Sequence, residues 1–531
     1  MEYIQNPILK GFNPDPSICR VGDDYYIATS TFEWFPGVQI HHSKDLKNWE
    51  LIARPLNRKS QLNMRGVPDS CGVWAPCLSY ANNKFYLVYT NVKSFDGVWK
   101  DTPNYVVTAD DIRGTWSDPI YLCSSGFDGS FFHDQDKLWF VNMIVDHRNG
   151  KLFGGVEMHE VDPQTLRLLN ERHFLTKGTK LGSTEGPHLY KRNEYYYLIL
   201  AEGGTEYNHS ATILRSKSVF GPYEEHPDNP ILTSKDSPKH TLQKAGHGSM
   251  IETQNGDWYI VFLIGRPLTE RGRCILGRET AIEEVVWKED WPFVNSGSRL
   301  PRLKVPNPNL EVASQKKEHV PVRIIFDQDK LPMEFQSLRI PMTENWVSLK
   351  ERKGFLRLTG RESLTSTHNQ SMIARRLQHF KAEVSTLVEF EPDCFQQMSG
   401  LILYYNTGHY HYLHITHRDD DKVLSIISAD NFQKIEDREI VVITGHSSVV
   451  LKASIQFENL QFSYKLKEDG PFTNIGSVLD ISILSDDNVR EGSERYRPAF
   501  TGSFIGLCCQ DLRSNKRYAD FGWFEYIGIE E

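Results

Sequence analysis

Tyr25-Tyr-Ile-Ala-Thr29 is the first of five similar aromatic segments that decide the fold of the first half of this chain. The other four are Phe85-Tyr-Leu-Val-Tyr89, Leu138-Trp-Phe-Val-Asn142, Tyr196-Tyr-Leu-Ile-Leu200 and Trp258-Tyr-Ile-Val-Phe262. Successive segments begin 53 to 62 residues apart, and a polar turn precedes most of them. A short apolar run after such a turn is typical of the second strand of a hairpin. The repeat therefore predicts five similar β-sheet units.

Each unit is about four strands long. In three of the repeats a further turn and an aromatic residue, Trp49, Trp116 or Tyr223, follow the aromatic segment where an outer strand would begin. Five four-stranded sheets around a central channel form a five-bladed β-propeller. The alternative is a β-sandwich array of unrelated hairpins. We predict an all-β protein whose first part is the propeller.

The repeat ends near Trp287, and the composition changes after it. Residues 301–321 are polar and rich in proline, as in a connector. Beyond them, strands with alternating apolar residues resume without the repeat of about 60 residues. We predict a propeller over residues 1–300, a linker over 301–321, and a β-sandwich of jelly-roll type over 322–531.

Composition excludes several classes of function. The net charge is −9 and no run of Lys or Arg is longer than a few residues, which disfavours a nucleic-acid partner. The mean hydropathy is −0.47, and no apolar run approaches the roughly 18 residues that cross a bilayer. The first residues lack the features of a signal peptide, so a cytoplasmic location is expected. The 8 cysteines have no C-x-x-C spacing and are expected to be reduced thiols.

Candidate functional residues occupy equivalent places in the five repeats. A position 10 or 11 residues before each aromatic segment carries Asp15, Trp74, Asp128, Glu185 or His247. This position falls near the start of the preceding strand, which lines the channel of a propeller. We therefore expect the three carboxylates, the indole and the imidazole to converge at one mouth of the channel.

Three converging carboxylates indicate acid–base chemistry. For a single Asp beside Pro or Gly, an Asx turn is the ordinary explanation, but three in register favour a site. Mutual repulsion raises the pKa of at least one, so that one carboxyl holds a proton while another activates water, as in glycoside hydrolysis. Trp74, Phe32 and Phe127 are predicted to form an apolar platform for the C–H face of a sugar.

Seven short motifs in order along the chain resemble those of glycoside hydrolase family 43, and within it the intracellular β-xylosidases. They are Asn6-Pro-Ile-Leu-Lys-Gly-Phe-Asn-Pro-Asp15-Pro-Ser-Ile18, Gly72-Val-Trp-Ala-Pro76, Gly126-Phe-Asp128, Thr184-Glu185-Gly-Pro-His188, Gly246-His247-Gly-Ser249, Leu276-Gly-Arg278-Glu-Thr280 and Gly506-Leu-Cys-Cys-Gln-Asp511. The resemblance spans about residues 4 to 527. It implies a propeller followed by a jelly-roll domain, and a hydrolase that inverts the anomeric configuration. The chain departs from the family pattern at Gly129, where proline is usual, and at Val145, where tryptophan is common.

The resemblance implies a role for each site residue. Asp15 corresponds to the general base, Glu185 to the general acid, and Asp128 to the carboxylate that orients this acid and raises its pKa. Arg278 corresponds to an arginine that grips sugar hydroxyls. In the second domain, Phe504, with Phe500 as second choice, is expected to reach over the mouth of the propeller.

The predicted function is that of an exo-β-1,4-xylosidase releasing xylose from the non-reducing end of xylobiose and short xylo-oligosaccharides, with α-L-arabinofuranosidase side activity. Alternatives are a main α-L-arabinofuranosidase activity, a fructosidase-like glycosidase, and a non-catalytic carbohydrate-binding propeller. No cofactor is expected to be required; a calcium ion or a water beside His247 remains an alternative. A homo-oligomer, dimer or tetramer, is expected.

Overall fold

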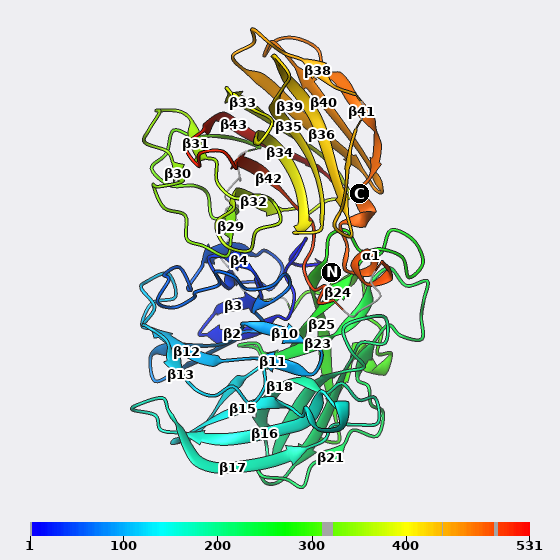
Figure 1. Ribbon diagram of the computed structural model, residues 1–531. Helices are drawn as coiled ribbons and strands as arrows, with labels where there is room; N and C mark the ends of the chain where they lie inside the picture. The colour runs from blue at the N-terminus through cyan, green and yellow to red at the C-terminus, as the bar shows by residue number, and fades with distance from the viewer. Residues whose placement is uncertain (1–2, 309, 311–321, 438, 493–496, 531) are drawn as a thin grey trace. The chain divides into compact units, whose positions relative to one another are not determined.

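The computed structural model describes a chain built almost entirely of β-strands (Figure 1). Residues 3–308, 310, 322–437, 439–492 and 497–530 are described, so positions 309 and 311–321 of the predicted linker lie outside the described residues. The chain divides into two compact units. Unit 1 comprises residues 1–64, 71–271 and 278–317, and unit 2 comprises 65–70, 272–277 and the part of the chain from 318 onward.

The described part of unit 1 contains five antiparallel sheets of four or five strands, which are the blades of a β-propeller. Blade 1 contains β2 (Ser17–Val21), β3 (Asp24–Thr29), β5 (Gln39–Ser43) and β6 (Glu50–Ala53); β4 (Trp34–Phe35) lies between β3 and β5 in the chain. Blade 2 contains β8 (Cys77–Ala81), β9 (Lys84–Val92), β12 (Asn104–Ala109) and β13 (Ile120–Tyr121), with β7 (Gly72–Val73) also on β9. Blade 3 contains β14 (Ser130–Asp134), β15 (Lys137–Val145), β16 (Phe153–Val161) and β17 (Leu168–Thr176).

The last two blades follow the same pattern. Blade 4 contains β18 (Glu185–Arg192), β19 (Tyr195–Glu202), β20 (Ser210–Ser216) and β21 (Glu224–Glu225), with β22 (Leu232–Thr233) also on β20. Blade 5 contains β23 (Gln243–Glu252), β24 (Trp258–Gly265), β25 (Arg278–Lys288) and β26 (Trp291–Val294). A separate hairpin, β10 (Ser94–Asp96) and β11 (Trp99–Asp101), leaves blade 2 between β9 and β12.

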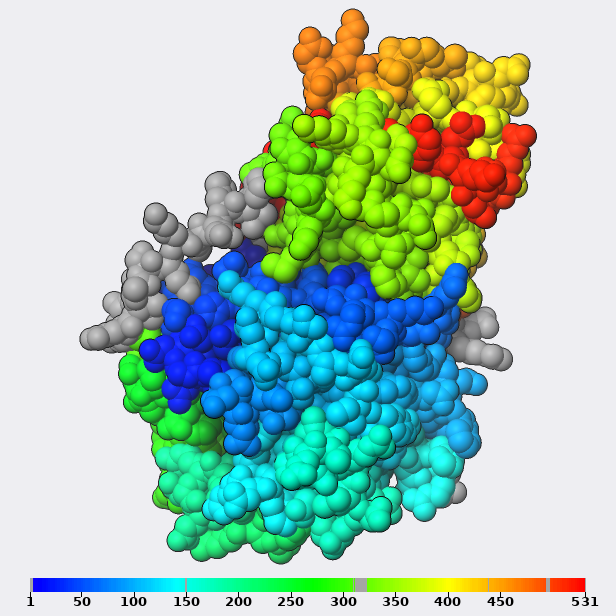
Figure 2. All heavy atoms as spheres, turned by 90° about the vertical axis from the view of Figure 1, so that its left-hand side faces the viewer, coloured from blue at the N-terminus to red at the C-terminus, as the bar shows by residue number. Residues whose placement is uncertain are grey.

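The first strand of each blade lines the centre of the ring. Contacts run from β2 to β8, β14, β18 and β23, and from β23 back to β2. The five aromatic segments are the second strands β3, β9, β15, β19 and β24, as predicted. Their central residues, such as Ile27, Val88 and Leu198, are fully buried, because each blade is covered on both faces by its neighbours. Figure 2 shows the atoms of blades 1 to 3, blue to cyan, packed against one another.

The N-terminal segment closes the ring by pairing with the last part of unit 1. Strand β1 (Tyr3–Gln5) pairs with β27 (Lys304–Pro306), and the Asn13 amide donates to the Arg278 carbonyl of blade 5 at 2.9 Å. The buried Asn6 side chain donates to the carbonyls of Ile282 and Arg302, both at 2.8 Å, and accepts from the Ile282 amide at 2.9 Å. The two ends of the propeller are thereby held together by hydrogen bonds.

Unit 2 is a sandwich of two antiparallel sheets, confirming the predicted jelly-roll domain. One sheet has the order β30 (Val347–Ser348), β31 (Leu356–Thr359), β43 (Tyr518–Ile529), β33 (Lys381–Phe390), β39 (Val449–Gln456), β40 (Asn459–Lys465), β41 (Thr473–Asp480), with β28 (Arg323–Ile325) on β43. The other has the order β37 (Gln433–Glu436), β36 (Asp421–Asp430), β35 (His409–Arg418), β34 (Gln397–Asn406), β42 (Phe504–Asp511), β32 (Ser371–Arg376), β29 (Gln336–Leu338), with β38 (Val441–Val442) on β36. Leu401, Leu507, Val384 and Leu451 are fully buried in the core. Helix α1 (Asp486–Glu491) precedes β42 in the chain.

Two short segments that interrupt the propeller sequence, 65–70 and 272–277, belong to unit 2. The buried Arg339 guanidinium donates to the Val67 carbonyl at 2.6 Å and to Asp69 Oδ1 at 2.7 Å. A Cβ at Gly277 would meet the Gly502 Cα at 2.7 Å, so the backbone of segment 272–277 approaches that of Gly502 closely. Sequence analysis did not anticipate this assignment, because no local pattern marks either segment.

Two further features concern the whole described chain. All 8 cysteines are free thiols. None of the helices in the described ranges has the length and apolar character to cross a bilayer.

The hydrogen bonds of Asn6 predict a large effect on stability. Asn6→Ala removes three hydrogen bonds and leaves buried carbonyl and amide groups of blade 5 unsatisfied. We expect the free energy of unfolding to fall by about 2–4 kcal/mol, measured by chemical denaturation. Gln5→Ala, at an exposed neighbouring position, should change it by less than about 0.5 kcal/mol. Equal effects of the two variants would contradict a closing role for Asn6.

Candidate active site

The five positions in register lie just before, at the start of, or within the inner strands. Asp15 and Asp128 each stand two residues before their strands, β2 and β14, and Glu185 is the first residue of β18. Trp74 lies between β7 and β8, and His247 lies within β23 where the register shifts. All five side chains are buried, with at most 9% of their surface exposed. Each of the five blades thus supplies one side chain to the candidate site.

Several site residues have a left-handed backbone. The φ angles are 54° at Asp15, 56° at Asp128, 52° at His247 and 51° at Phe32. For residues with a Cβ this region is sparsely populated, and Asp and His are enriched among those that adopt it. A phenylalanine there carries a strain of about 1–3 kcal/mol, which the surrounding blades must offset. The left-handed backbone points these side chains in directions that a regular β-strand would not give them.

Asp15 is held as an ionised carboxylate. Its Oδ1 accepts from Arg278 Nη1 at 3.1 Å, and its Oδ2 accepts from the Ser30 hydroxyl at 2.6 Å. His247 Nδ1 lies 3.7 Å from Oδ1. Burial alone would raise the pKa of Asp15, but Arg278, His247 and the hydrogen bond from Ser30 together hold it below its usual value. Asp15 therefore carries a negative charge at neutral pH.

The other two carboxyls have the opposite tendency. Burial, with the negative charge of Asp15 as a second cause, raises the pKa of Glu185 to about 8. Burial and the charges of Glu185 and Asp15 also raise the pKa of Asp128 well above its usual value, although its Oδ2 accepts from the Gly186 amide at 3.2 Å. The site therefore combines one carboxylate, Asp15, with two carboxyls whose pKa values are raised, and a pKa of about 8 leaves Glu185 protonated near neutrality.

His247 packs against the backbone of Gly186, next to Glu185. A Cβ on Gly186, whose φ is 57°, would lie 3.0 Å from His247 Nε2, so the imidazole occupies the space beside this glycine. Burial is the main cause that lowers the pKa of His247, which favours the neutral ring. Among the described residues, no group of three or more His, Cys, Asp and Glu side chains is arranged to hold a metal ion. The calcium ion considered for this position stays a prediction.

Aromatic rings form one wall of the site. The Trp74 ring lies 6.3 Å from Phe32 and 4.9 Å from Phe127, measured between centroids, and Phe127 meets it edge-on. The guanidinium carbon of Arg278 lies 5.6 Å from the centre of the Phe32 ring. The structure thus brings the predicted platform together with the arginine that binds Asp15.

Sequence reasoning missed two polar residues of this site. Ser30, at the end of blade 1's second strand, holds the second oxygen of Asp15. Lys100, on the β10–β11 hairpin, has its Nζ 4.0 Å from the centre of the Phe95 ring, which itself lies 6.3 Å from Trp74. Burial lowers the pKa of Lys100 to about 8, and the charges of Cys71 and Glu185 act in the opposite direction. Neither residue occurs in a register position, so no spacing signal could have found them.

The departure at Gly129 has a local explanation. A Cβ at this position would lie 2.4 Å from Cε2 of the Phe140 ring on β15. Phe140 is fully buried and fills the space that a proline ring would need. The glycine after Asp128 is therefore required by the packing of blade 3.

Phe504 and Phe500 lie in unit 2. Phe504 is the first residue of β42 and is fully buried, with the Arg376 guanidinium 5.2 Å from its ring centre. Phe500 is 8% exposed, and its amide donates to the Ser70 hydroxyl at 3.1 Å. A position of either ring over the carboxylates of unit 1 stays a prediction.

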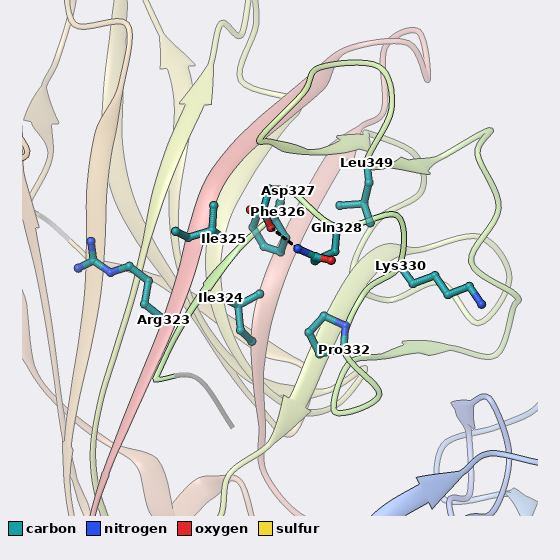
Figure 3. A pocket seen from close by; sticks show the side chains of 9 residues that line it. All are labelled: Arg323, Ile324, Ile325, Phe326, Asp327, Gln328, Lys330, Pro332 and Leu349. Carbon is teal, nitrogen blue, oxygen red and sulfur yellow. Dashed lines mark hydrogen bonds between the residues drawn. The ribbon is translucent and has the colours of Figure 1, made fainter. Parts of the chain in front are cut away.

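A hollow of about 400 Å³ is found in unit 2, and none of its lining residues is among those predicted for catalysis (Figure 3). Its polar members include Gln328, whose amide donates to Asp327 at 3.0 Å. It presents one aromatic side chain, Phe326, which is itself buried. Its lining comprises Arg323, Ile324, Ile325, Phe326, Asp327, Gln328, Lys330, Pro332 and Leu349. The hollow lacks the carboxyl pair that acid–base hydrolysis needs, so unit 1 carries the candidate active site.

A propeller whose blades supply three carboxyls of unequal pKa and an aromatic wall has the equipment of a glycoside hydrolase. A family model described as glycosyl hydrolases family 43 matches residues 4–292. A second model, described as the beta xylosidase C-terminal concanavalin A-like domain, matches residues 323–527. The chain belongs to glycosyl hydrolase family 43.

Similar proteins cover nearly the whole chain. A xylosidase/arabinosidase 43B of Humicola insolens is 49% identical over 100% of this chain and 98% of its own length. A beta-xylosidase of Bacillus subtilis is 48% identical over 98% of this chain and 99% of its own. The crystal structure of a xylan beta-1,4-xylosidase from Bacillus halodurans superposes with a TM-score of 0.95 at 49% identity, covering 98% of this chain and 99% of that one.

The raised pKa of Glu185 makes a prediction about stability that needs no substrate. The unfolded chain releases this proton near its ordinary pKa of 4.5, but the folded chain releases it only at about 8. The contribution of this carboxyl to stability is therefore complete below pH 4.5 and is lost as the pH rises to about 8. Glu185→Gln should become more stable than the wild type by at least about 3 °C in Tm by pH 8, with a smaller difference at pH 5.

Asp15→Asn is the matched control for this measurement. Because the pKa of Asp15 is lowered, its contribution to stability is present above its ordinary pKa and lost in acid. The asparagine variant should therefore be less stable than the wild type at pH 7, where Arg278 loses its ionic partner. A Tm difference for Glu185→Gln that does not change between pH 5 and 8 would contradict the raised pKa.

Proposed function

We propose that this protein is an inverting exo-β-1,4-xylosidase that removes xylose from the non-reducing end of xylobiose and short xylo-oligosaccharides. The observation that carries the proposal is the opposite shift of two carboxyl pKa values, lowered at Asp15 and raised to about 8 at Glu185. Environments that separate two such pKa values define a base and an acid. The names of the Bacillus relatives support xylose as the sugar.

In the proposed mechanism, water is activated and the leaving group is protonated in one step. Asp15 accepts a proton from a water molecule, which attacks the anomeric carbon from the face opposite the leaving group. Glu185 donates its proton to the glycosidic oxygen, so the leaving sugar departs as a neutral alcohol. Asp128, which accepts a hydrogen bond from the Gly186 amide, orients Glu185. Burial and the negative charge of Asp15 keep the pKa of Glu185 high, and Arg278 holds Asp15 in its charged form.

The residues around the reacting sugar complete the proposed single-displacement mechanism. Trp74, Phe32 and Phe127 provide the apolar surface on which the C–H face of the xylose ring rests. Three carboxyls supply both the proton and the base, so the proposed reaction requires no cofactor.

The free thiols support a reducing compartment, the cytoplasm, as the location. A homo-oligomer remains part of the proposal.

A second activity is proposed because the Humicola relative is named for both sugars. α-L-Arabinofuranosides present a pentose whose shared hydroxyls can meet the same arginine and aromatic wall. Hydrolysis of 4-nitrophenyl α-L-arabinofuranoside at a rate below that of the matching β-xyloside is the expected result. A higher rate on the arabinofuranoside would reverse the order of the two activities.

The stereochemistry of the product tests the mechanism. Proton NMR during the first minutes of xylobiose hydrolysis should show α-xylose from the cleaved end before mutarotation supplies the β-anomer. Early release of β-xylose from that end would exclude a single displacement. The same assay on β-1,3-linked xylobiose decides whether the linkage is also recognised.

The two carboxyl roles are tested by isosteric amides. Asp15→Asn and Glu185→Gln should each reduce kcat on xylobiose by roughly 10²–10⁴-fold, since each removes one proton-transfer partner. Both variants should fold, as judged by circular dichroism. Retention of more than about a third of the wild-type turnover by either variant would remove that residue from its role.

A further inference from the structure

Glu202, at the end of β19, is a fully buried carboxylate surrounded by neutral donors. Its Oε1 accepts from the Thr179 amide and from the Thr184 hydroxyl, both at 2.8 Å. Its Oε2 accepts from the Thr179 hydroxyl at 2.6 Å and from the Thr212 hydroxyl at 2.8 Å. Four hydrogen bonds therefore meet on one side chain, which sequence analysis did not single out.

Three of these four bonds come from one loop. Residues 177–184 connect β17 of blade 3 to β18 of blade 4, and Thr179 and Thr184 both belong to this loop. The fourth donor, Thr212, lies on β20 of the same sheet as Glu202. Glu202 thus ties a loop to the rigid centre of blade 4.

The backbone of the loop packs closely around the Glu202 carboxyl group. Gly178 has a φ of 82°, and a Cβ there would lie 2.4 Å from Glu202 Oε1 and 2.0 Å from Thr184 Oγ1. The Thr184 hydroxyl also lies 3.2 Å from the Lys177 carbonyl, at the start of the loop. At the other side, the Gly203 amide donates to the Gly182 carbonyl at 2.8 Å. The backbone therefore wraps closely around the end of Glu202.

The loop ends at the residue that supplies the acid. Thr184 is joined directly to Glu185, and Glu185 is paired across the sheet with Ala201, the neighbour of Glu202. Within the described part of the chain, no salt bridge holds the Glu185 carboxyl in place. The hydrogen bond from Thr184 to Glu202 fixes the backbone from which Glu185 projects. A displacement of about 1 Å at a reacting group can lower a rate by about 100-fold.

We propose that Glu202 is a positioning residue that sets the place of Glu185 for proton donation, through its hydrogen bonds to Thr179 and Thr184. This inference rests on the proposed function, since it assigns a role within that reaction. Glu202 acts through the geometry of the loop and does not contact the substrate. The Thr184 hydroxyl is the last link between Glu202 and the acid.

The loss of rate caused by a defect in proton donation depends on the leaving group. The loss of rate caused by a smaller amount of folded protein does not, so the two causes can be distinguished. The xylose that leaves from xylobiose is a poor leaving group and needs the proton from Glu185. The phenolate that leaves from 2,4-dinitrophenyl β-D-xyloside is stable without a proton. A misplaced acid therefore slows the first substrate much more than the second, whereas a smaller amount of folded enzyme slows both equally.

Two isosteric variants provide the test. Thr184→Val and Thr212→Val each remove one hydroxyl that donates to Glu202 at 2.8 Å, but only the first hydroxyl belongs to the loop. We expect Thr184→Val to lower kcat on xylobiose by about 10-fold and on the dinitrophenyl xyloside by less than about 2-fold. Its basic pH limb should move to lower pH, because a loosened Glu185 is better solvated. Thr212→Val should keep the wild-type ratio of the two rates.

The outcomes separate this inference from the proposed function. Equal losses on both substrates in Thr184→Val with an unmoved basic limb, or the same change of ratio in Thr212→Val, would overturn the positioning role while xylosidase activity stands. If the wild type hydrolyses neither xyloside, the proposed function fails. The role of Glu202 is then decided without substrate, from the Tm difference between the protein with Glu185 and its Glu185→Gln variant, measured at pH 5 and pH 8. The change of this Tm difference with pH should be smaller when Thr184→Val is also present and the same as in the wild type when Thr212→Val is present. An unchanged value in both backgrounds would overturn the inference.

Discussion

Closure of the propeller ring is the constraint on which the site depends. The Asn13 amide donates to the Arg278 carbonyl, and two residues further along Asp15 binds the Arg278 guanidinium, although the two are separated by 263 positions in sequence. The pairing of β1 with β27 brings the first and last blades into this contact. Asp15 and its counter-ion Arg278 therefore meet only in a closed ring, and the other inner strands complete the circle between them.

Arg278 and the polar groups around it influence how charge is shared among the three carboxyls. Burial raises the pKa of each of them, but at Asp15 the charges of Arg278 and His247 and the hydrogen bond from Ser30 hold the pKa below its usual value. Asp128 and Glu185 receive less compensation, so their pKa values stay raised. The opposite pKa shifts follow from the unequal distribution of positive charge and donors around chemically similar groups.

The fold and the inner-strand residues could be predicted because a repeat imposes the same geometry five times. The spacing of 10 or 11 residues placed Asp15, Asp128 and Glu185 at equivalent strand starts, which the structure shows close to Arg278 and the aromatic wall. Ser30, Lys100 and Glu202 could not be predicted in this way, since each acts across strands or loops and lies outside the repeated position. The assignment of residues 65–70 and 272–277 to unit 2 had no local signal for the same reason.

The left-handed backbone at Asp15, Phe32, Asp128 and His247 restricts which amino acids these positions can accept during evolution. Only Gly, Asn, Asp and, less readily, His adopt such angles at low cost, and β-branched residues are largely excluded. Trp74 and Phe127 are not among the left-handed positions. A change of sugar preference, in nature or by directed evolution, is therefore more accessible through these two rings than through Phe32, whose replacement would also have to satisfy the backbone.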